Sequence, residues 1–368
     1  MPDVRPAPVT ATAPGGVRPA GRSAADLPDL PSPVPAWPGE QVPADGGTVF
    51  LRHTPRTGAD EGARALYVHG LGGASTNWTD LAALLSGRLE GFAVDLPGFG
   101  RSAPPPHGRY SIARHVQAVE AVLADVAARP GPGRDQPVHL LGNSLGGLVS
   151  LLVAVRRPDL VATLTLISPA MPVYRVPPAF DRAIALLLVP GVPALAEKRV
   201  RLGAPEDRVR MTLEMCFGDP ARVPPERLAE AVEEMRLRDG QSWSGRALTR
   251  SMRGLMTSYL RVGRANAWRA ARSVTAPALV VWGDRDKLVD PRLAPRLATA
   301  LPDARLQVQA GIGHVAMMEA PEDTARAVLA MLEETGSGLL DGTGATGATG
   351  RSDTSSAGPD HDGGPAPA

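Results

Sequence analysis

Short apolar runs alternate with longer amphipathic segments along the middle of this 368-residue chain. The apolar runs are bounded by Gly, Pro and Asp, which predicts buried strands, and the segments between them have the apolar spacing of helices. This alternation is typical of the α/β class, in which a mostly parallel sheet carries helices on both faces. We expect strands at residues 48–53, 65–69, 92–95, 138–142, 163–168, 278–283 and 305–309.

One interval is too long for this pattern. About 110 residues separate the fifth expected strand from the sixth, whereas a strand–helix–strand step needs about 30. The excess, residues 171–271, has helical periodicity, for instance at Leu228, Val232 and Met235. We therefore expect a helical cap inserted into a core of residues 43–170 and 272–335.

Both ends of the chain have the composition of disordered tails. Residues 1–42 are dense in Pro, Ala and Gly, and residues 336–368 include a Gly-Thr-Ala repeat. Such segments bury too little apolar surface to offset the entropy of ordering. We expect neither tail to contribute to the core.

Charge and cysteine content exclude several classes of protein. The 39 basic and 38 acidic residues leave a net charge of +1, and the arginines look dispersed, which argues against a nucleic-acid partner. Apolar runs of about 18 residues are lacking, so no membrane span is expected. Cys216 is the only cysteine, and the first residues lack a basic segment followed by an apolar one, so we expect a cytoplasmic protein.

A G-x-S-x-G sequence occupies residues 142–146, with Ser144 at its centre. It directly follows the apolar run 137–141 and precedes the helix-like run 147–155. A strand, a sharp turn and a helix in this order would expose the Ser144 hydroxyl above the sheet edge as a nucleophile. Taken alone, the motif also describes an ordinary Gly/Ser turn; its flanks favour the catalytic interpretation.

A serine nucleophile needs a base and an acid that orients the base. His314 lies in a glycine-flanked loop after an expected strand, and we predict that it is the base. Three carboxylates follow the 278–283 strand; we predict that Asp286 is the acid, because the turn at Gly283 carries it past the strand tip. Asp284 is expected to cap that turn, and Asp290 to cap the following helix.

Stabilising the oxyanion requires two N–H donors. The loop after the 65–69 strand can turn the Leu71 N–H toward the nucleophile, and the Leu145 N–H begins the helix after Ser144. His69 is expected to hold that loop in shape. We expect structural roles also for the remaining histidines: His53, His107, His115, His139 and His361.

Four motifs in this order resemble one family. They are His-Gly-Leu-Gly at 69–72, Asp-Leu-Pro-Gly-Phe-Gly-Arg-Ser at 95–102, Trp-Gly-Asp-Arg-Asp at 282–286 and Gly-His at 313–314. Together with the G-x-S-x-G sequence at 142–146, which we call the elbow, they make residues 49–332 similar to α/β-hydrolase-fold enzymes of the esterase, lipase and C–C-hydrolase group. The resemblance implies a cap that lies over the site.

The leading interpretation is a serine hydrolase that cleaves a small-molecule carboxylic ester with an apolar portion, without metal or organic cofactor. Residues 142–147 and Asn77-Trp78 also resemble the meta-cleavage C–C hydrolases, although Val315 replaces their typical Trp. Haloalkane dehalogenases of this fold use Asp where this chain has Ser144, so that activity is disfavoured. The alternative outside enzymes is an inactive hydrolase-like protein that serves as a binding module. Candidate lining residues of the acyl pocket are Met215, Phe217, Trp243 and Met256.

Overall fold

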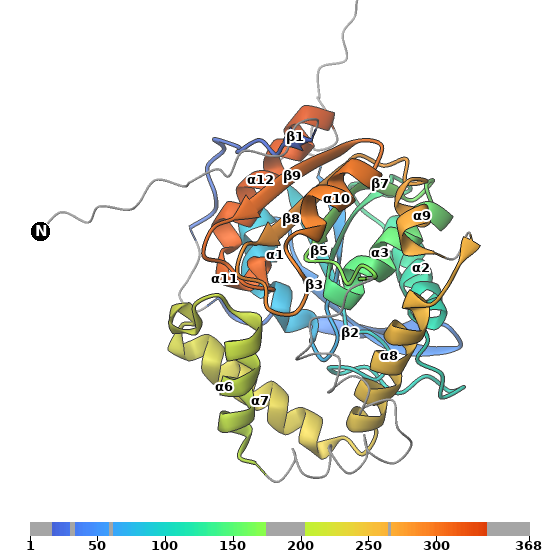
Figure 1. Ribbon diagram of the computed structural model, residues 1–368, viewed down its shortest axis with the longest axis vertical. Helices are drawn as coiled ribbons and strands as arrows, with labels where there is room; N and C mark the ends of the chain where they lie inside the picture. The colour runs from blue at the N-terminus through green and yellow to red at the C-terminus, as the bar shows by residue number, and fades with distance from the viewer. Residues whose placement is uncertain (1–16, 30–33, 59–61, 174–202, 264–265, 337–368) are drawn as a thin grey trace, which may run out of the picture.

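The computed structural model describes residues 17–29, 34–58, 62–173, 203–263 and 266–336. Within these residues nine strands form one sheet in the order β1-β9-β8-β7-β6-β4-β5-β3-β2 (Figure 1). The β2–β3 and β3–β5 pairs are antiparallel and the others parallel, so the prediction of a mostly parallel sheet is confirmed. The strands are β1 Arg18–Pro19, β2 Gly39–Ala44, β3 Gly47–Thr54, β4 Ala63–Val68, β5 Leu89–Val94, β6 Val138–Asn143, β7 Val161–Ile167, β8 Ala278–Gly283 and β9 Ala304–Gln309.

Helices cover both faces of the sheet, as expected from strands that are apolar on both sides. In β4, Leu66 and Val68 pack into one core cluster, whereas Ala65 and Tyr67 point into a second. The first cluster includes α2, α3, α9 and α10, and the second includes α1, α11 and α12 (Figure 1). The bounds of these helices are α1 Thr79–Leu85, α2 Ile112–Ala128, α3 Ser144–Arg156, α9 Ala267–Ala271, α10 Leu293–Ala300, α11 Ala316–Glu319 and α12 Pro321–Thr335.

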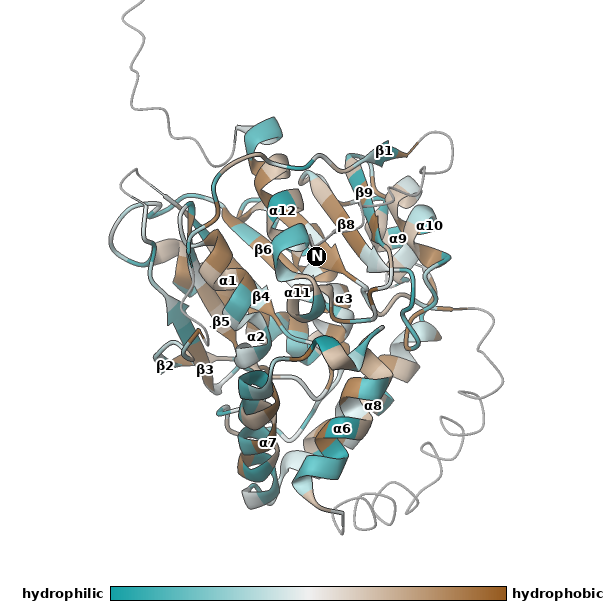
Figure 2. Ribbon diagram, turned by 90° about the vertical axis from the view of Figure 1, so that its left-hand side faces the viewer, coloured by the Kyte–Doolittle hydropathy of each residue, from teal (hydrophilic) through white to brown (hydrophobic). Residues whose placement is uncertain are grey.

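Three helices between β7 and β8 stand together on one side of the sheet (Figure 2). They are α6 Pro205–Cys216, α7 Pro225–Gly240 and α8 Ser244–Tyr259, and we call them the cap helices. The described part of the expected cap is thus helical, although α9 packs on α3 in the core layer. Residues 174–202 of that expected insertion lie outside the described residues.

The prediction of a disordered tail over residues 1–42 is wrong for residues 17–29 and 34–42. Strand β1 pairs with β9, with Arg18 opposite Arg305, and β2 forms an antiparallel pair with β3. Arg18 also forms ion pairs with Asp303 and Glu334. Backbone hydrogen bonds at the two sheet edges therefore order a segment whose composition is dense in Pro, Ala and Gly. The predicted C-terminal tail, apart from Gly336 at the end of α12, lies outside the described residues.

Candidate active site

The turn between β6 and α3 holds Ser144 in a strained conformation. Its φ is +53°, in the left-handed region that non-glycine residues seldom adopt. The turn presses against the neighbouring strand: a Cβ on Gly146 would lie 2.2 Å from the Val68 carbonyl oxygen. Only glycine fits there, so the sequence 142–146 has the geometry expected of a nucleophile elbow.

The loop after β4 lies beside this elbow. A Cβ built on Gly70 would be 3.0 Å from the Cβ of Ser144. The Gly73 N–H donates to the Gly70 carbonyl at 3.0 Å, which closes a turn with Leu71 as its first central residue. Leu145 is the second residue of α3, where backbone N–H groups have no partner within the helix. Both predicted oxyanion donors thus come from segments that border Ser144.

His314 and Asp286 are brought together by the structure. Asp286 Oδ2 accepts a hydrogen bond from His314 Nδ1 at 2.8 Å, and both side chains are buried. Asp286 Oδ1 accepts from the N–H groups of Leu288 and Val289 at 2.8 and 2.9 Å. This places the carboxylate in one orientation, which leaves its second oxygen for the imidazole.

The other two carboxylates after β8 bond backbone N–H groups, one in a distant loop and one in the adjacent turn. Asp284 Oδ1 accepts from the Gly311 N–H at 2.7 Å, and Asp290 Oδ1 accepts from the Arg292 N–H at 3.0 Å. The expected capping roles are not observed: Asp284 bonds the loop before His314 instead of its own turn, and the N-cap of α10 (Leu293–Ala300) is Arg292, so Asp290 caps only the turn before that helix. The structure gives neither carboxylate a bond to His314.

Asn143 connects the elbow to the His314 loop. Its buried Nδ2 donates to the Ile167 carbonyl at 3.1 Å and to the His314 carbonyl at 3.0 Å. The residue before Ser144 thus fixes the backbone of His314 from β6. We call Ser144, Asp286 and His314 the candidate triad.

His69 acts on the loop as expected. Its Nε2 accepts from the Leu96 N–H at 2.9 Å, so its proton sits on Nδ1, which donates to the Gly70 carbonyl at 2.7 Å. Burial lowers the pKa of His69, and Arg238 lowers it further against the opposing effect of Asp95. A neutral His69 keeps this tautomer, and with it the shape of the loop.

Glu319 is a site residue that the sequence reasoning missed. It is 8 % exposed, and its carboxylate accepts three backbone hydrogen bonds from two loops. Gly313 N–H donates to Oε2 at 2.7 Å, and Gly218 and Asp219 donate at 3.0 and 2.9 Å. A lone acidic residue within the apolar stretch 312–320 was the available signal, since a buried charge requires partners.

The cap helices hold both catalytic loops. The His314 N–H donates to the carbonyl of Cys216, the last residue of α6, at 2.6 Å. Lys287, next to Asp286, donates Nζ to the Glu214 carbonyl at 2.7 Å. From α7, Arg238 Nη2 donates to the Gly72 carbonyl at 2.5 Å. A displacement of the cap helices would therefore reach the predicted base, the predicted acid and the predicted oxyanion loop.

Replacing Glu319 with glutamine should reduce kcat more than it changes KM. The amide NH2 would face at least one backbone N–H that the carboxylate now accepts. We expect a loss of about 2 kcal/mol in the free energy of unfolding, a Tm lower by about 3 °C, and a kcat about tenfold lower as His314 shifts. Steady-state kinetics and a thermal scan measure these effects.

The matched control is Glu322→Gln, on the exposed first turn of α12. The Glu322→Gln substitution should leave kcat and Tm unchanged. A Glu319→Gln variant with parental kcat and Tm would show that the His314 loop keeps its place without this carboxylate.

The four predicted pocket residues have different surroundings. Met215 is 51 % exposed, whereas Phe217 is 3 % exposed and belongs to the same core cluster as Val315. Met256 is half-buried against the other cluster, and Trp243 is half-buried with an Nε1 that has no hydrogen-bond partner among the described residues. A common role in lining an acyl pocket stays a prediction.

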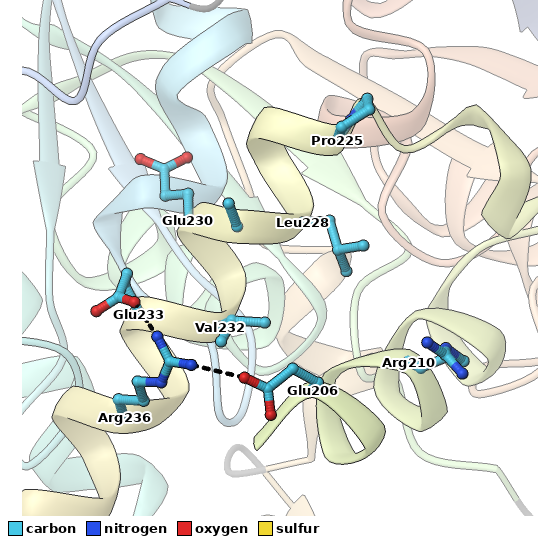
Figure 3. Close-up of a pocket in the computed structure, with 9 residues that line it drawn as sticks. Glu206, Arg210, Pro225, Leu228, Glu230, Val232, Glu233 and Arg236 are labelled. Carbon is cyan, nitrogen blue, oxygen red and sulfur yellow. Dashed lines mark hydrogen bonds and ion pairs between the residues drawn. The ribbon is translucent and has the colours of Figure 1, made fainter. Parts of the chain in front are cut away.

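A cavity of about 510 Å³ lies between α6 and α7 (Figure 3). Leu228 and Val232 line it, and Arg236 crosses its rim with ion pairs to Glu206 and Glu233. Its walls come from the cap helices alone, and no residue of the candidate triad lines it. This cavity is therefore separate from the candidate triad.

Other titratable side chains have structural surroundings. His139 Nδ1 is hydrogen-bonded to Thr163 at 2.8 Å, within the sheet as expected. Burial, with Asp286 nearby, raises the pKa of the Cys216 thiol to about 11, so it is not a thiolate at neutral pH.

In the described ranges, no cluster of His, Cys, Asp and Glu could hold a metal ion. Among those same residues, none of the helices combines the length and apolarity needed to cross a bilayer.

The sequence of this chain is similar to those of known hydrolases. A model of the Alpha/beta hydrolase family matches residues 65–327. The chain is 24% identical to monoacylglycerol lipase abhd6-B of Xenopus laevis, over 71% of this chain and 72% of that protein. It is 26% identical to lipase 3 of Moraxella sp. (strain TA144), over 72% and 75%.

Among solved structures, haloalkane dehalogenase from Bradyrhizobium elkani USDA94 superposes with a TM-score of 0.67 and 20% identity, covering 82% of this chain and 99% of that one. At this identity the superposition establishes the fold alone.

Proposed function

Because this chain belongs to the alpha/beta hydrolase family, whose model matches residues 65–327, we propose that it is a serine hydrolase of carboxylic esters. The observation that carries this proposal is the pairing of His314 with Asp286 at 2.8 Å. The His314 carbonyl also accepts a hydrogen bond from Asn143, the residue before the strained Ser144. The two lipases to which the chain is similar support an ester as the substrate.

In the proposed reaction, Ser144 Oγ attacks the ester carbonyl while His314 takes its proton. Asp286 orients the imidazole and stabilises its charged form. The N–H groups of Leu71 and Leu145 bind the tetrahedral oxyanion, His314 protonates the leaving alcohol, and an acyl-enzyme remains. Water activated by the same imidazole then releases the acid and restores Ser144.

The substrate is proposed to be a small ester with an apolar portion, and the reaction needs only water and the side chains named above. We propose a cytoplasmic location, since the lone Cys216 can form no disulfide within the chain. C–C bond hydrolysis is the competing activity, since residues 142–147 resemble the elbow of the meta-cleavage hydrolases.

A substrate panel tests the proposal. It consists of p-nitrophenyl esters of graded chain length and one vinylogous diketone, assayed beside a fluorophosphonate probe. We expect ester turnover and covalent labelling of Ser144. Cleavage of the diketone alone would assign the chain to C–C hydrolysis, and folded protein that is neither labelled nor active would be a binding module.

A further inference from the structure

Helix α8 carries a row of arginines on its outer face. Arg246, Arg250 and Arg253 are exposed, and at 3.6 residues per turn they lie within about 60° of one another around the helix. The expectation that the arginines are dispersed is wrong for this helix, because the net charge of the whole chain conceals a local stripe.

The opposite face of α8 fixes its orientation. Ala247, Ser251 and Leu255 are buried, and Ser251 Oγ lies 3.0 Å from Nε2 of His115 on α2, within hydrogen-bond distance. Because this inner face is held against the core, the arginine row points to solvent.

Among the described residues, these arginines have no acidic partner. Residues 241–283 contain seven arginines and no Lys, Asp or Glu. Arg250 donates Nη1 to the Gly108 carbonyl at 2.8 Å, and within the described part of the chain no ion pair involves Arg246, Arg250 or Arg253. On α7, by contrast, Arg227 is paired with Asp80 and Glu230. The positive charge of α8 is therefore not neutralised by any carboxylate among the described residues.

Two aliphatic side chains project at the C-terminal end of this row. Leu260 is 82 % exposed and Val262 is 84 % exposed, and they flank Arg261, which is exposed as well. Nearly full exposure of two neighbouring aliphatic residues beside a cation suits insertion between lipid headgroups. We call the whole set the α8 surface: Arg246, Arg250, Arg253, Leu260, Arg261 and Val262.

We propose that the α8 surface docks on an anionic lipid bilayer. Unpaired arginines are complementary to acidic headgroups, and the two aliphatic side chains reach the acyl boundary. A nucleic acid or an acidic protein would match the charge, but an anionic polymer has no use for the projecting Leu260 and Val262. This inference does not depend on the ester-hydrolase proposal, because docking involves no residue of the candidate triad.

Vesicle sedimentation tests the proposal with the full chain. We expect it to sediment with phosphatidylcholine vesicles containing about one-third phosphatidylglycerol at low salt, to stay in solution with pure phosphatidylcholine, and to be released at about 0.5 M NaCl. Lack of sedimentation with the anionic vesicles would overturn the proposal. Binding to polyglutamate or DNA instead of vesicles would also overturn it, by assigning the surface to an acidic polymer.

Two variants test whether the protein binds the vesicles through α8. The triple change Arg246→Gln, Arg250→Gln and Arg253→Gln should lower the partition coefficient about 100-fold, at about fivefold per charge. The pair Leu260→Ser and Val262→Ser should lower it while preserving the salt dependence.

The control is a triple variant, Arg134→Gln, Arg157→Gln and Arg292→Gln, which removes three positive charges outside α8. This variant should sediment with the anionic vesicles like the parent protein. The Tm should be unchanged in all three variants, which shows that they are folded. Equal binding by the α8 triple variant and this control would show that α8 is not the docking surface.

Discussion

Replacing Ser144 with alanine is expected to lower kcat by about four to six orders of magnitude without unfolding the protein. The alanine removes the only oxygen proposed to form the acyl-enzyme, whereas the oxyanion donors and the pair of His314 with Asp286 stay in place. Because alanine relieves none of the positive φ at this position, Tm should change little. Single-turnover kinetics with a p-nitrophenyl ester and a thermal scan measure the two quantities.

Ser150→Ala is the matched control for this variant. Ser150 lies on the same helix, is buried, and its Oγ has no hydrogen-bond partner among the described residues. Its replacement should leave turnover and fluorophosphonate labelling intact. Near-parental turnover in Ser144→Ala would contradict the assignment of the nucleophile, and labelling of that variant would locate the reactive group elsewhere.

The elbow was predictable from the sequence because its causes are local. The strand expected at 138–142 is observed as Val138–Asn143, and the helix after it begins at Ser144. Apolar runs mark buried strands, and closely spaced glycines mark a tight turn, so a window of about ten residues contains the needed information. The positions of Asp286 and His314 after strands β8 and β9 could be predicted for the same reason.

The edges of the sheet were not predictable in this way. In β2 only Val42 and Ala44 are buried, and the strand contains Pro43. Strand β1 is two residues long and meets a partner that is remote in sequence, with Arg18 opposite Arg305. Edge pairing depends on backbone hydrogen bonds, which leave little trace in hydropathy, so composition alone suggested a disordered tail.

Glu319 escaped for a related reason. Its partners are backbone N–H groups of Gly313, Gly218 and Asp219. Because the side chains of these residues take no part in the contact, their identities do not predict a buried carboxylate. Two of the three lie about 100 residues away. Contacts of this kind arise only when the cap helices and the core are in place, which is why residue patterns predicted the candidate triad but not the carboxylate that holds the His314 loop.

Asp286→Asn is expected to lower kcat by about four orders of magnitude, whereas Asp284→Asn should change it by less than about threefold. At position 286 the charge that stabilises the imidazolium is lost. The amide must also place its NH2 either against the N–H groups of Leu288 and Val289 or against His314 Nδ1. The second arrangement makes Nδ1 an acceptor and puts the proton on Nε2, so that the nitrogen facing the nucleophile can no longer act as a base.

At position 284 the side chain is exposed, and an asparagine Oδ1 can still accept from the Gly311 N–H that now lies 2.7 Å away. The two substitutions are chemically identical and two residues apart, so the comparison isolates the bond to His314. Both variants should be assayed for kcat and for Tm at the same pH. If Asp284→Asn proved the more damaging with both proteins folded, the acid that orients His314 would have to be Asp284, and the 2.8 Å contact of Asp286 with the imidazole would not be the catalytic one.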